Sequence, residues 1–283
     1  MSFLDRIREC NEYDLGRFQP LRIAGHRLGW VRHDIAERLA NYPHVFECGE
    51  RAMVLSTRLD SFETRSAAVA PVLEALRDDG VIPAWRDERY PVAMTYGAPP
   101  LLQMERAAFP CLGLRAYGVH INGFVREGGH TKMWIARRAL DKPTFPGLLD
   151  NMVAGGLPIG IGLRDNLIKE CAEEAGIPEG LAMRAVPTGA ISYCKEVPEG
   201  LKPDLQFVYD LELPPGFKPQ PVDGEVDAFY LWPIEKVMEV VANSNDFKFN
   251  CALVIIDFLV RRGFLSPEDV DYLQIVDGLR RPL

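Results

Sequence analysis

Apolar and polar positions repeat with the period of an α-helix over residues 164–175. The apolar side chains fall on one face of that helix: Leu167, Ile168, Cys171, Ala172 and Ala175. Three acids, Glu170, Glu173 and Glu174, gather on the opposite face. Gly176 follows at a position where a helix end favours a left-handed residue, and glycines before the helix allow a tight turn. The pattern predicts a loop, a helix with one packed and one acidic face, and a stop.

The first 115 residues mix helical and extended patterns. Helices are predicted over residues 3–10, 32–40 and 62–76. Residues 21–31 have the character of a strand. Five prolines between residues 83 and 110 favour further strands and turns. Residues 1–115 are therefore expected to form a small α+β domain.

Residues 116–283 predict a second domain. Strands are expected over residues 118–125, 132–136, 190–197, 204–213 and 226–232. Helices are expected over residues 233–241, 247–262 and 267–279. The middle one is heavily apolar, but it is too short to cross a membrane and carries Asp257. It is expected to be a core helix, and no membrane partner is predicted.

The length of 283 residues exceeds that of a usual single domain, which supports the division into two. The net charge of −8 leaves no basic excess for a nucleic acid, so none is expected as a partner. Six cysteines without a CxxC pair suggest neither a zinc site nor a disulfide framework. The N-terminus lacks an apolar targeting segment, so a cytoplasmic location is predicted. The oligomeric state stays open.

Three acids spaced i, i+3 and i+4 repel one another unless a cation lies among them. Carboxylate oxygens are the ligands that Mg²⁺ or Mn²⁺ prefers. The acidic face of the helix therefore indicates a divalent metal site. The alternative is a solvated acidic face without a ligand.

This segment resembles a Nudix box, whose pattern is G, five residues, E, seven residues, R, E, an aliphatic, any residue, E, E, any residue, G, an aliphatic. The positions in register are Gly155, Glu170, Cys171, Glu173, Glu174, Gly176 and Ile177. Two positions depart from it, because Ile161 replaces the first Glu and Lys169 the Arg. Lysine lacks the planar fork of arginine. The two changes suggest the joint loss of one ion pair, or else an inactive box.

Stretches outside the box extend the resemblance over nearly the whole chain, to the Nudix subfamily that includes plant proteins and the Nudix portion fused to thiamin pyrophosphokinase in fungi. The stretches are WRDERYPV, YGVHINGFVR, SYCKEV, QFVYDLELP and NCALVIIDFLVRRG. The resemblance implies an α/β/α Nudix sandwich on a mixed sheet, preceded by a smaller α+β domain. It also implies metal-dependent hydrolysis of thiamin diphosphate or its damaged oxo and oxy forms to the monophosphate. A nucleoside-diphosphate-sugar or ADP-ribose pyrophosphatase, or an inactive ligand-binding module, are the alternatives.

The resemblance places the metal on Glu170, Glu173 and Glu174, with the carbonyl of Gly155 as an extra ligand. Glu174 and Glu170 are the acids expected to be essential for catalysis. Glu225 is a further ligand or general base, or else a surface acid at a strand edge.

Cations near the box are candidates for binding the diphosphate of a small-molecule substrate. Arg137 and Arg138 lie on the strand leading to the box, where strand alternation allows only one of them to face the substrate. Lys132 and Lys142 are weaker candidates. Trp85 could line a pocket for the organic group of the substrate, or could lie in a packed turn. Further aromatic side chains that could line such a pocket are Trp30, Tyr90 and Tyr96.

Overall fold

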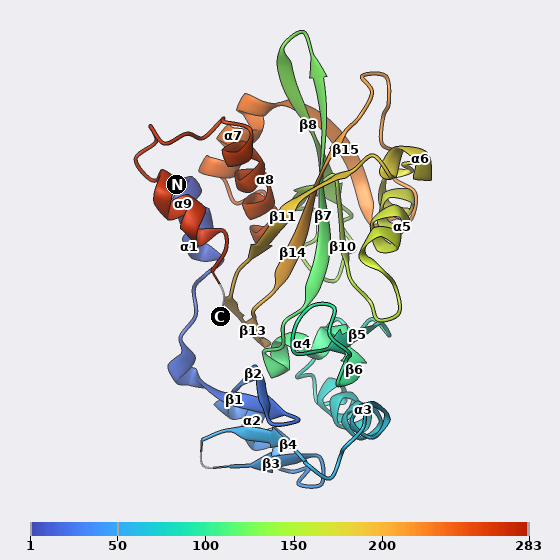
Figure 1. Ribbon diagram of the computed structural model, residues 1–283, viewed down its shortest axis with the longest axis vertical. Helices are drawn as coiled ribbons and strands as arrows, with labels where there is room; N and C mark the ends of the chain where they lie inside the picture. Colours follow the sequence, from blue (N-terminus) through green and yellow to red (C-terminus); the bar gives the residue numbers. More distant parts are fainter. Residues whose placement is uncertain (1, 50, 282–283) are drawn as a thin grey trace.

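The computed structural model describes residues 2–49 and 51–281, which form two bodies stacked along the long axis of the molecule (Figure 1). The smaller body, blue to cyan in the figure, contains most of the first 112 residues. The larger body is built on a mixed sheet with helices on both faces. The first helix, α1 (Phe3–Glu9), lies with the larger body.

The smaller body has a four-stranded sheet in the order β2-β1-β4-β3 and a separate strand pair. Its strands are β1 (Phe18–Ile23), β2 (His26–Arg32), β3 (Phe46–Cys48), β4 (Met53–Leu55), β5 (Arg89–Val92) and β6 (Leu102–Glu105). Its helical segments are η1 (Leu15–Arg17), α2 (His33–Leu39), α3 (Phe62–Asp78), η2 (Arg106–Ala108) and α4 (Phe109–Leu112). A capping box at Ser61 starts α3, whose Val72 and Leu73 enter the core.

The larger body has a main sheet in the order β11-β14-β7-β8-β15, with β10 paired to β7 and β9 to β8. Its strands are β7 (Tyr117–Glu127), β8 (His130–Arg138), β9 (Leu149–Asn151), β10 (Val153–Gly156), β11 (Val186–Ser192), β14 (Leu205–Glu212) and β15 (Val226–Pro233). A separate hairpin joins β12 (Lys195–Val197) to β13 (Gly200–Lys202). The β14–β7 pair is parallel and the others are antiparallel, which confirms the mixed sheet.

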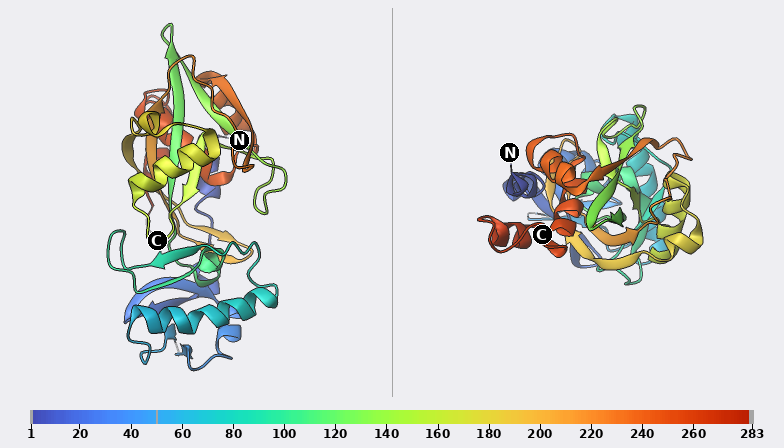
Figure 2. Two further views of the ribbon diagram at one scale, coloured as in Figure 1. Left: turned by 90° about the vertical axis from the view of Figure 1, so that its right-hand side faces the viewer. Right: turned by 90° about the horizontal axis from the view of Figure 1, so that it is seen from above.

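Helices cover both faces of the main sheet. They are α5 (Leu163–Ala175), α6 (Glu179–Ala182), α7 (Ile234–Asn243), α8 (Phe249–Arg261) and α9 (Tyr272–Gly278). In the left view of Figure 2, α5 lies in front of the sheet. Strand alternation sends Ile121 into the core beneath α5 and Phe124 into the core beneath α8. The α/β/α sandwich is confirmed, and within the described ranges no helix is long and apolar enough to cross a membrane.

The helix α1 packs away from the smaller body. Its Leu4 and Ile7 are buried in the core that α8 and α9 share. The division of the chain at residue 115 remains a prediction, and the chain enters the larger body before it forms the smaller one.

Three predicted elements differ from the structure. The strand expected over residues 190–197 is divided between β11 of the main sheet and β12 of the separate hairpin. The strand expected over residues 21–31 is a hairpin, because Ala24 (φ 49°) and Gly25 (φ 82°) form a two-residue turn between β1 and β2. The helix expected over residues 267–279 is shorter, Tyr272–Gly278. The segment before it takes turns in place of helix.

Candidate functional site

The acidic helix forms as predicted. α5 begins at Leu163 and ends at Ala175, where Gly176 takes a left-handed conformation with φ 60°. Leu167 and Cys171 are buried against the sheet. This packing fixes the face on which the acids of the box project.

Glu174 is buried between α5 and β10. Its carboxylate accepts a hydrogen bond of 2.9 Å from the backbone N–H of Ala154. Burial raises the pKa of Glu174 well above its ordinary value, and the amide of Ala154 only partly opposes this. The sequence pattern placed Glu174 on an exposed helix face, which is wrong, because β10 covers this side of the helix.

Glu170 lies directly against Gly155 of β10. A β-carbon added at Gly155 would lie 2.3 Å from the carboxyl carbon of Glu170, so a side chain there would displace the Glu170 carboxylate. Burial raises the pKa of Glu170; Lys169 opposes the shift, and the charges of Glu173 and Glu225 add to it. The absence of a side chain at residue 155 thus leaves the Glu170 carboxylate against the backbone of β10.

Lys169, which replaces the arginine of the Nudix pattern, pairs with two of the box acids. Its Nζ lies 2.6 Å from Glu173 Oε2 and 3.3 Å from Glu170 Oε1. Glu173 is exposed and turns to this cation. Ile161 is half-buried and offers no oxygen. The structure therefore brings Glu170 and Glu174 to Gly155 and β10, while Glu173 lies at the outer side.

Glu225 precedes β15 and joins the same acidic region. Its carboxylate lies 2.5 Å from Lys142 Nζ. Burial would raise the pKa of Glu225, but the hydrogen bond and charge of Lys142 outweigh it, so the pKa is lowered. Glu225 also raises the pKa values of Glu170 and Glu174 by repulsion. The charge of Glu225 is thus coupled to those of Glu170 and Glu174.

The two arginines at the end of β8 have different surroundings. Arg138 lies 3.0 Å from Asp150 and donates to the backbone carbonyls of Thr144 and Phe145. It therefore holds the loop after β8. Arg137 is half-buried, and its side chain has no hydrogen bond or ion pair within residues 2–49 and 51–281. Of the pair, Arg137 is the one with a guanidinium left for a ligand.

Lys132 lies far from the box. It pairs with Glu127 near the tip of the β7–β8 hairpin, at 3.2 Å. Lys132 is opposite Val125, whereas Gly155 is opposite Val119. Six residues along a strand span about 20 Å. The structure does not bring Lys132 to the other candidates.

A cleft of about 650 Å³ lies between the two bodies. The box strand lines it with Ala154, Gly155 and Gly156. The smaller body contributes Arg86, Tyr90 and Arg106, among others. Further walls come from Phe145, Tyr193, Lys195, Asp204, Lys248 and Phe249. The cleft combines aromatic surface with both signs of charge beside the box.

Among the four aromatic side chains expected to wall a pocket, Tyr90 is the one that lines this cleft. Trp85 turns to its own body, where its indole N–H donates to Asp87 at 2.8 Å and Arg77 stacks on its ring. Trp85 therefore lies in a packed turn, which was the alternative to contact with a substrate. Tyr96 packs on Phe207 outside the cleft.

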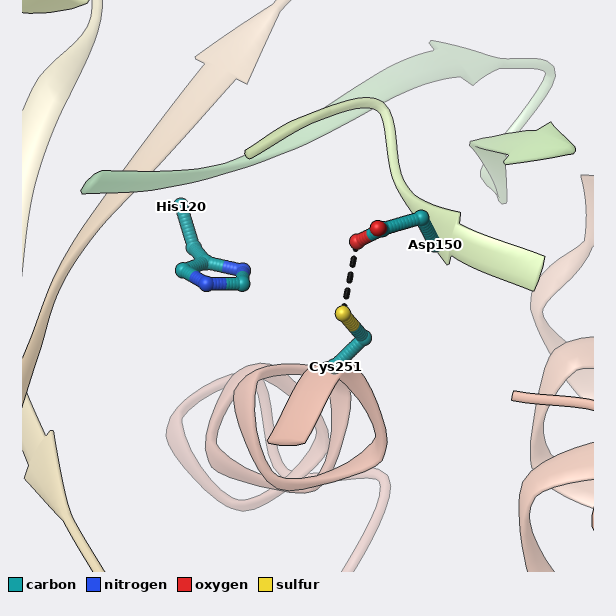
Figure 3. A group of neighbouring side chains, drawn as sticks. All are labelled: His120, Asp150 and Cys251. Atoms are coloured by element: carbon teal, nitrogen blue, oxygen red, sulfur yellow. Dashed lines mark hydrogen bonds between the residues drawn. The ribbon is translucent and has the colours of Figure 1, made fainter. Parts of the chain in front are cut away.

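Three buried side chains from separate strands and a helix meet beneath the cleft (Figure 3). They are His120 of β7, Asp150 of β9 and Cys251 of α8, and their ligand-type atoms lie within 4.8 Å of one another. No other group of His, Cys, Asp or Glu in the described ranges is this close. By spacing alone, the trio could hold a metal ion.

The trio is already satisfied without an ion. Arg138 and Lys248 lie 3.0 and 3.9 Å from Asp150. The Cys251 thiol donates to Asp150 at 2.6 Å, and burial raises the pKa of that thiol well above its ordinary value. His120 lies 2.7 Å from the amide oxygen of Asn151. Two cations and a protonated thiol around one carboxylate describe a hydrogen-bonded network better than a metal centre.

We expect the network to make stability depend on pH through His120. Burial lowers the pKa of His120 from 6.5 to about 4. When folding lowers the pKa of a group, the folded protein keeps its full stability above the pKa that the group has in the unfolded chain. This stability is lost as the pH falls through the pKa of the group in the folded chain. The free energy of unfolding should therefore drop by about 3 kcal/mol between pH 6.5 and 4. Urea denaturation of His120→Gln should show a smaller drop, and equal drops in both proteins would contradict the assignment.

Sequence patterns offered Tyr90 only as aromatic material for a pocket, and gave no sign of Arg106 at the box or of Asp150 beside His120 and Cys251. These residues come together only through the sheet register and the docking of the smaller body. Only information on the contact between β5 and the loop of the box, which are far apart in the sequence, could have predicted the place of Tyr90 and Arg106.

Comparisons with known proteins give the following relatives. Residues 2–116 match a family model described as a domain of unknown function, DUF4743. The chain is 43% identical to Nudix hydrolase 20, chloroplastic, of Arabidopsis thaliana over 99% of this chain and 78% of that protein. It is 42% identical to Nudix hydrolase 24, chloroplastic, of the same plant over the same shares. Among solved structures, a Deinococcus radiodurans protein, DR0079, covers 63% of this chain and 100% of its own, with 20% identity and a TM-score of 0.46.

The cytoplasmic location predicted from the sequence is contradicted by these relatives. Both plant proteins, which match nearly the whole chain, are named as chloroplastic. The prediction rested on the absence of an apolar segment at the N-terminus, and that absence does not separate the cytoplasm from a plastid.

Proposed function

This chain belongs to the Nudix hydrolase family, and from that premise we propose that it hydrolyses a small organic diphosphate with Mg²⁺ or Mn²⁺ at the site formed by Gly155, Glu170 and Glu174. The chain is an enzyme that acts on acid anhydrides. The substrate favoured here is thiamin diphosphate or one of its oxo and oxy forms, with the monophosphate as product.

The observation that best supports this proposal is the contact between Gly155 and the Glu170 carboxylate. Glu174 is held at Ala154, one residue away. This donor set fits a divalent ion, because carboxylate and carbonyl oxygens are its preferred ligands. Burial and mutual repulsion raise the pKa values of Glu170 and Glu174, so a cation would relieve a cost that the fold already bears. Glu173 would join only by leaving Lys169.

A bound divalent ion would neutralise phosphoryl oxygens and favour ionisation of water. Glu225 is the proposed base, because its carboxylate is close enough to Glu170 and Glu174 to raise their pKa values and can accept a proton from water. Lys142 holds this carboxylate at 2.5 Å. Arg137 is the proposed partner of the diphosphate on β8.

The lining of the cleft beside the box favours a substrate whose organic group is flat and cationic. Tyr193 and Phe249 stand edge to face in its wall, with ring centroids 5.6 Å apart. The buried Asp204 and the nearby Glu196 lie in the same wall, where Lys202 and Arg17 pair with them. These features suit a thiamin-type group, whose ring carries a positive charge.

Two other functions are distinguished by experiment. A nucleotide-sugar or ADP-ribose pyrophosphatase would use the same box. An inactive binding module is favoured by Ile161 and Lys169 and opposed by the retained Glu170 and Glu174. A phosphate-release screen with Mg²⁺ over thiamin diphosphate, its oxo form, ADP-ribose and a nucleotide sugar separates them. Faster turnover of the nucleotides would refute the thiamin assignment.

Replacing Ile161 by glutamate is expected to leave kcat/KM similar or lower. The site is built without an acid there, and Lys169 is already engaged by Glu170 and Glu173. Steady-state kinetics at saturating Mg²⁺ check this expectation. A gain of about a hundredfold, roughly 2.7 kcal/mol, would show a crippled box and favour the binding module.

A further inference from the structure

The smaller body touches the Nudix box directly. The backbone carbonyl of Arg89 in β5 accepts a hydrogen bond of 3.0 Å from Ile159 in the loop of the box. The next residue, Tyr90, lies against Gly156, where an added β-carbon would be 1.4 Å from the phenol oxygen. Tyr90 is buried, at 4% exposure, and its hydroxyl has no hydrogen-bond partner in the described part of the chain. Strand β5 is therefore packed against the box loop and β10.

Arg106 packs on Tyr90 of β5. Its guanidinium stacks over the Tyr90 ring, 5.1 Å from the centroid, and pairs with Glu88. Its side chain is 40% exposed and lines the cleft together with Gly155 and Gly156. A cation of the smaller body is thus held beside the two glycines at the end of β10.

We propose that Arg106 binds the diphosphate of the substrate and that Tyr90 is the residue that positions it. A guanidinium presents paired N–H donors that match phosphate oxygens, and the stacked ring fixes its plane. A diphosphate would replace Glu88 as the anionic partner of Arg106. The inference rests on the proposed function only in requiring that the site takes a diphosphate, whatever the organic group.

The test measures binding of inorganic pyrophosphate to the full chain by titration calorimetry, with Mg²⁺ at a fixed concentration. Pyrophosphate has no organic group, so the identity of the natural substrate does not enter. Arg106→Gln is expected to raise the Kd for pyrophosphate about tenfold or more, and Arg106→Lys should recover part of the lost affinity. Affinities of the unchanged chain and Arg106→Gln within twofold of each other would overturn the proposal.

Matched variants separate binding from damage to the fold. Glu88→Gln breaks the same ion pair but keeps the cation, so it should bind pyrophosphate at least as tightly as the unchanged chain. Arg89→Gln alters an exposed cation outside the cleft and should have no effect. If Glu88→Gln loses as much affinity as Arg106→Gln, the loss comes from the broken pair and the proposal fails.

The role of Tyr90 has its own readout. Tyr90→Phe keeps the ring beneath Arg106 and should keep the affinity, whereas Tyr90→Leu removes the stacking surface and should weaken pyrophosphate binding severalfold. Equal affinity of the Phe and Leu variants would remove Tyr90 from the proposal. Failure to cleave thiamin diphosphate would refute the proposed substrate but would leave these binding results unchanged.

Discussion

Glu174→Gln is expected to lower kcat by about a thousandfold or more, and Glu170→Gln by a comparable factor, because each change removes a negative charge from the proposed metal site. A thousandfold loss corresponds to about 4 kcal/mol of transition-state stabilisation. Steady-state kinetics at saturating Mg²⁺ provide the measurement. Glu173→Gln is the matched control, since Glu173 is exposed and paired with Lys169, and we expect a smaller loss. A kcat near that of the unchanged chain in Glu174→Gln would show that the metal ligands are misassigned.

Stability gives a second signature of Glu174. Its folded pKa is raised above the ordinary value of 4.5, so the unfolded chain ionises first as the pH rises. The free energy of unfolding of the metal-free protein should therefore fall as the pH rises above about 4.5. Urea denaturation with a chelator should show a weaker fall in Glu174→Gln. The same fall in both proteins would mean that the carboxylate is not strained in the fold.

Gly155→Ala is expected to cost activity at least a hundredfold. The new β-carbon would lie 2.3 Å from the carboxyl carbon of Glu170 and would push this acid away from β10. Overpacking of this kind also costs about 1–3 kcal/mol of stability. Kinetics and thermal unfolding of the same sample separate the two effects.

The matched control for this change is Gly180→Ala. A β-carbon at Gly180 meets nothing within 4 Å, and the residue lies in the short helix α6. Activity and stability should both be close to those of the unchanged chain. A fully active Gly155→Ala would show that Glu170 does not need its place against β10.

Local periodicity was enough to predict the box helix and the heavily apolar core helix. The span of α5 differs from the predicted residues 164–175 by one residue, because the glycines set both ends. The sandwich and its mixed sheet were predicted from the family resemblance, and the sheet order confirms them. The hairpin over residues 21–31 was missed, since the turn at Ala24 and Gly25 lacks a polar residue.

The surroundings of the site could not be predicted in the same way. Helical spacing put Glu170, Glu173 and Glu174 on one face but could not show that β10 buries Glu174. Nor could it show that β5 of the smaller body lies against Gly156. Both facts depend on contacts between distant segments, and burial by another element leaves no trace in the period of a single helix.

The central claim is hydrolysis of a diphosphate by the Gly155–Glu170–Glu174 site, and phosphorus NMR of the full chain with thiamin diphosphate tests it most directly. With Mg²⁺ we expect the two diphosphate signals to be replaced by those of a monophosphate ester and orthophosphate. No change is expected with a chelator or with Glu174→Gln. Unchanged diphosphate signals in the presence of Mg²⁺ and of Mn²⁺, from a folded protein that binds the compound, would contradict the account and indicate a binding module.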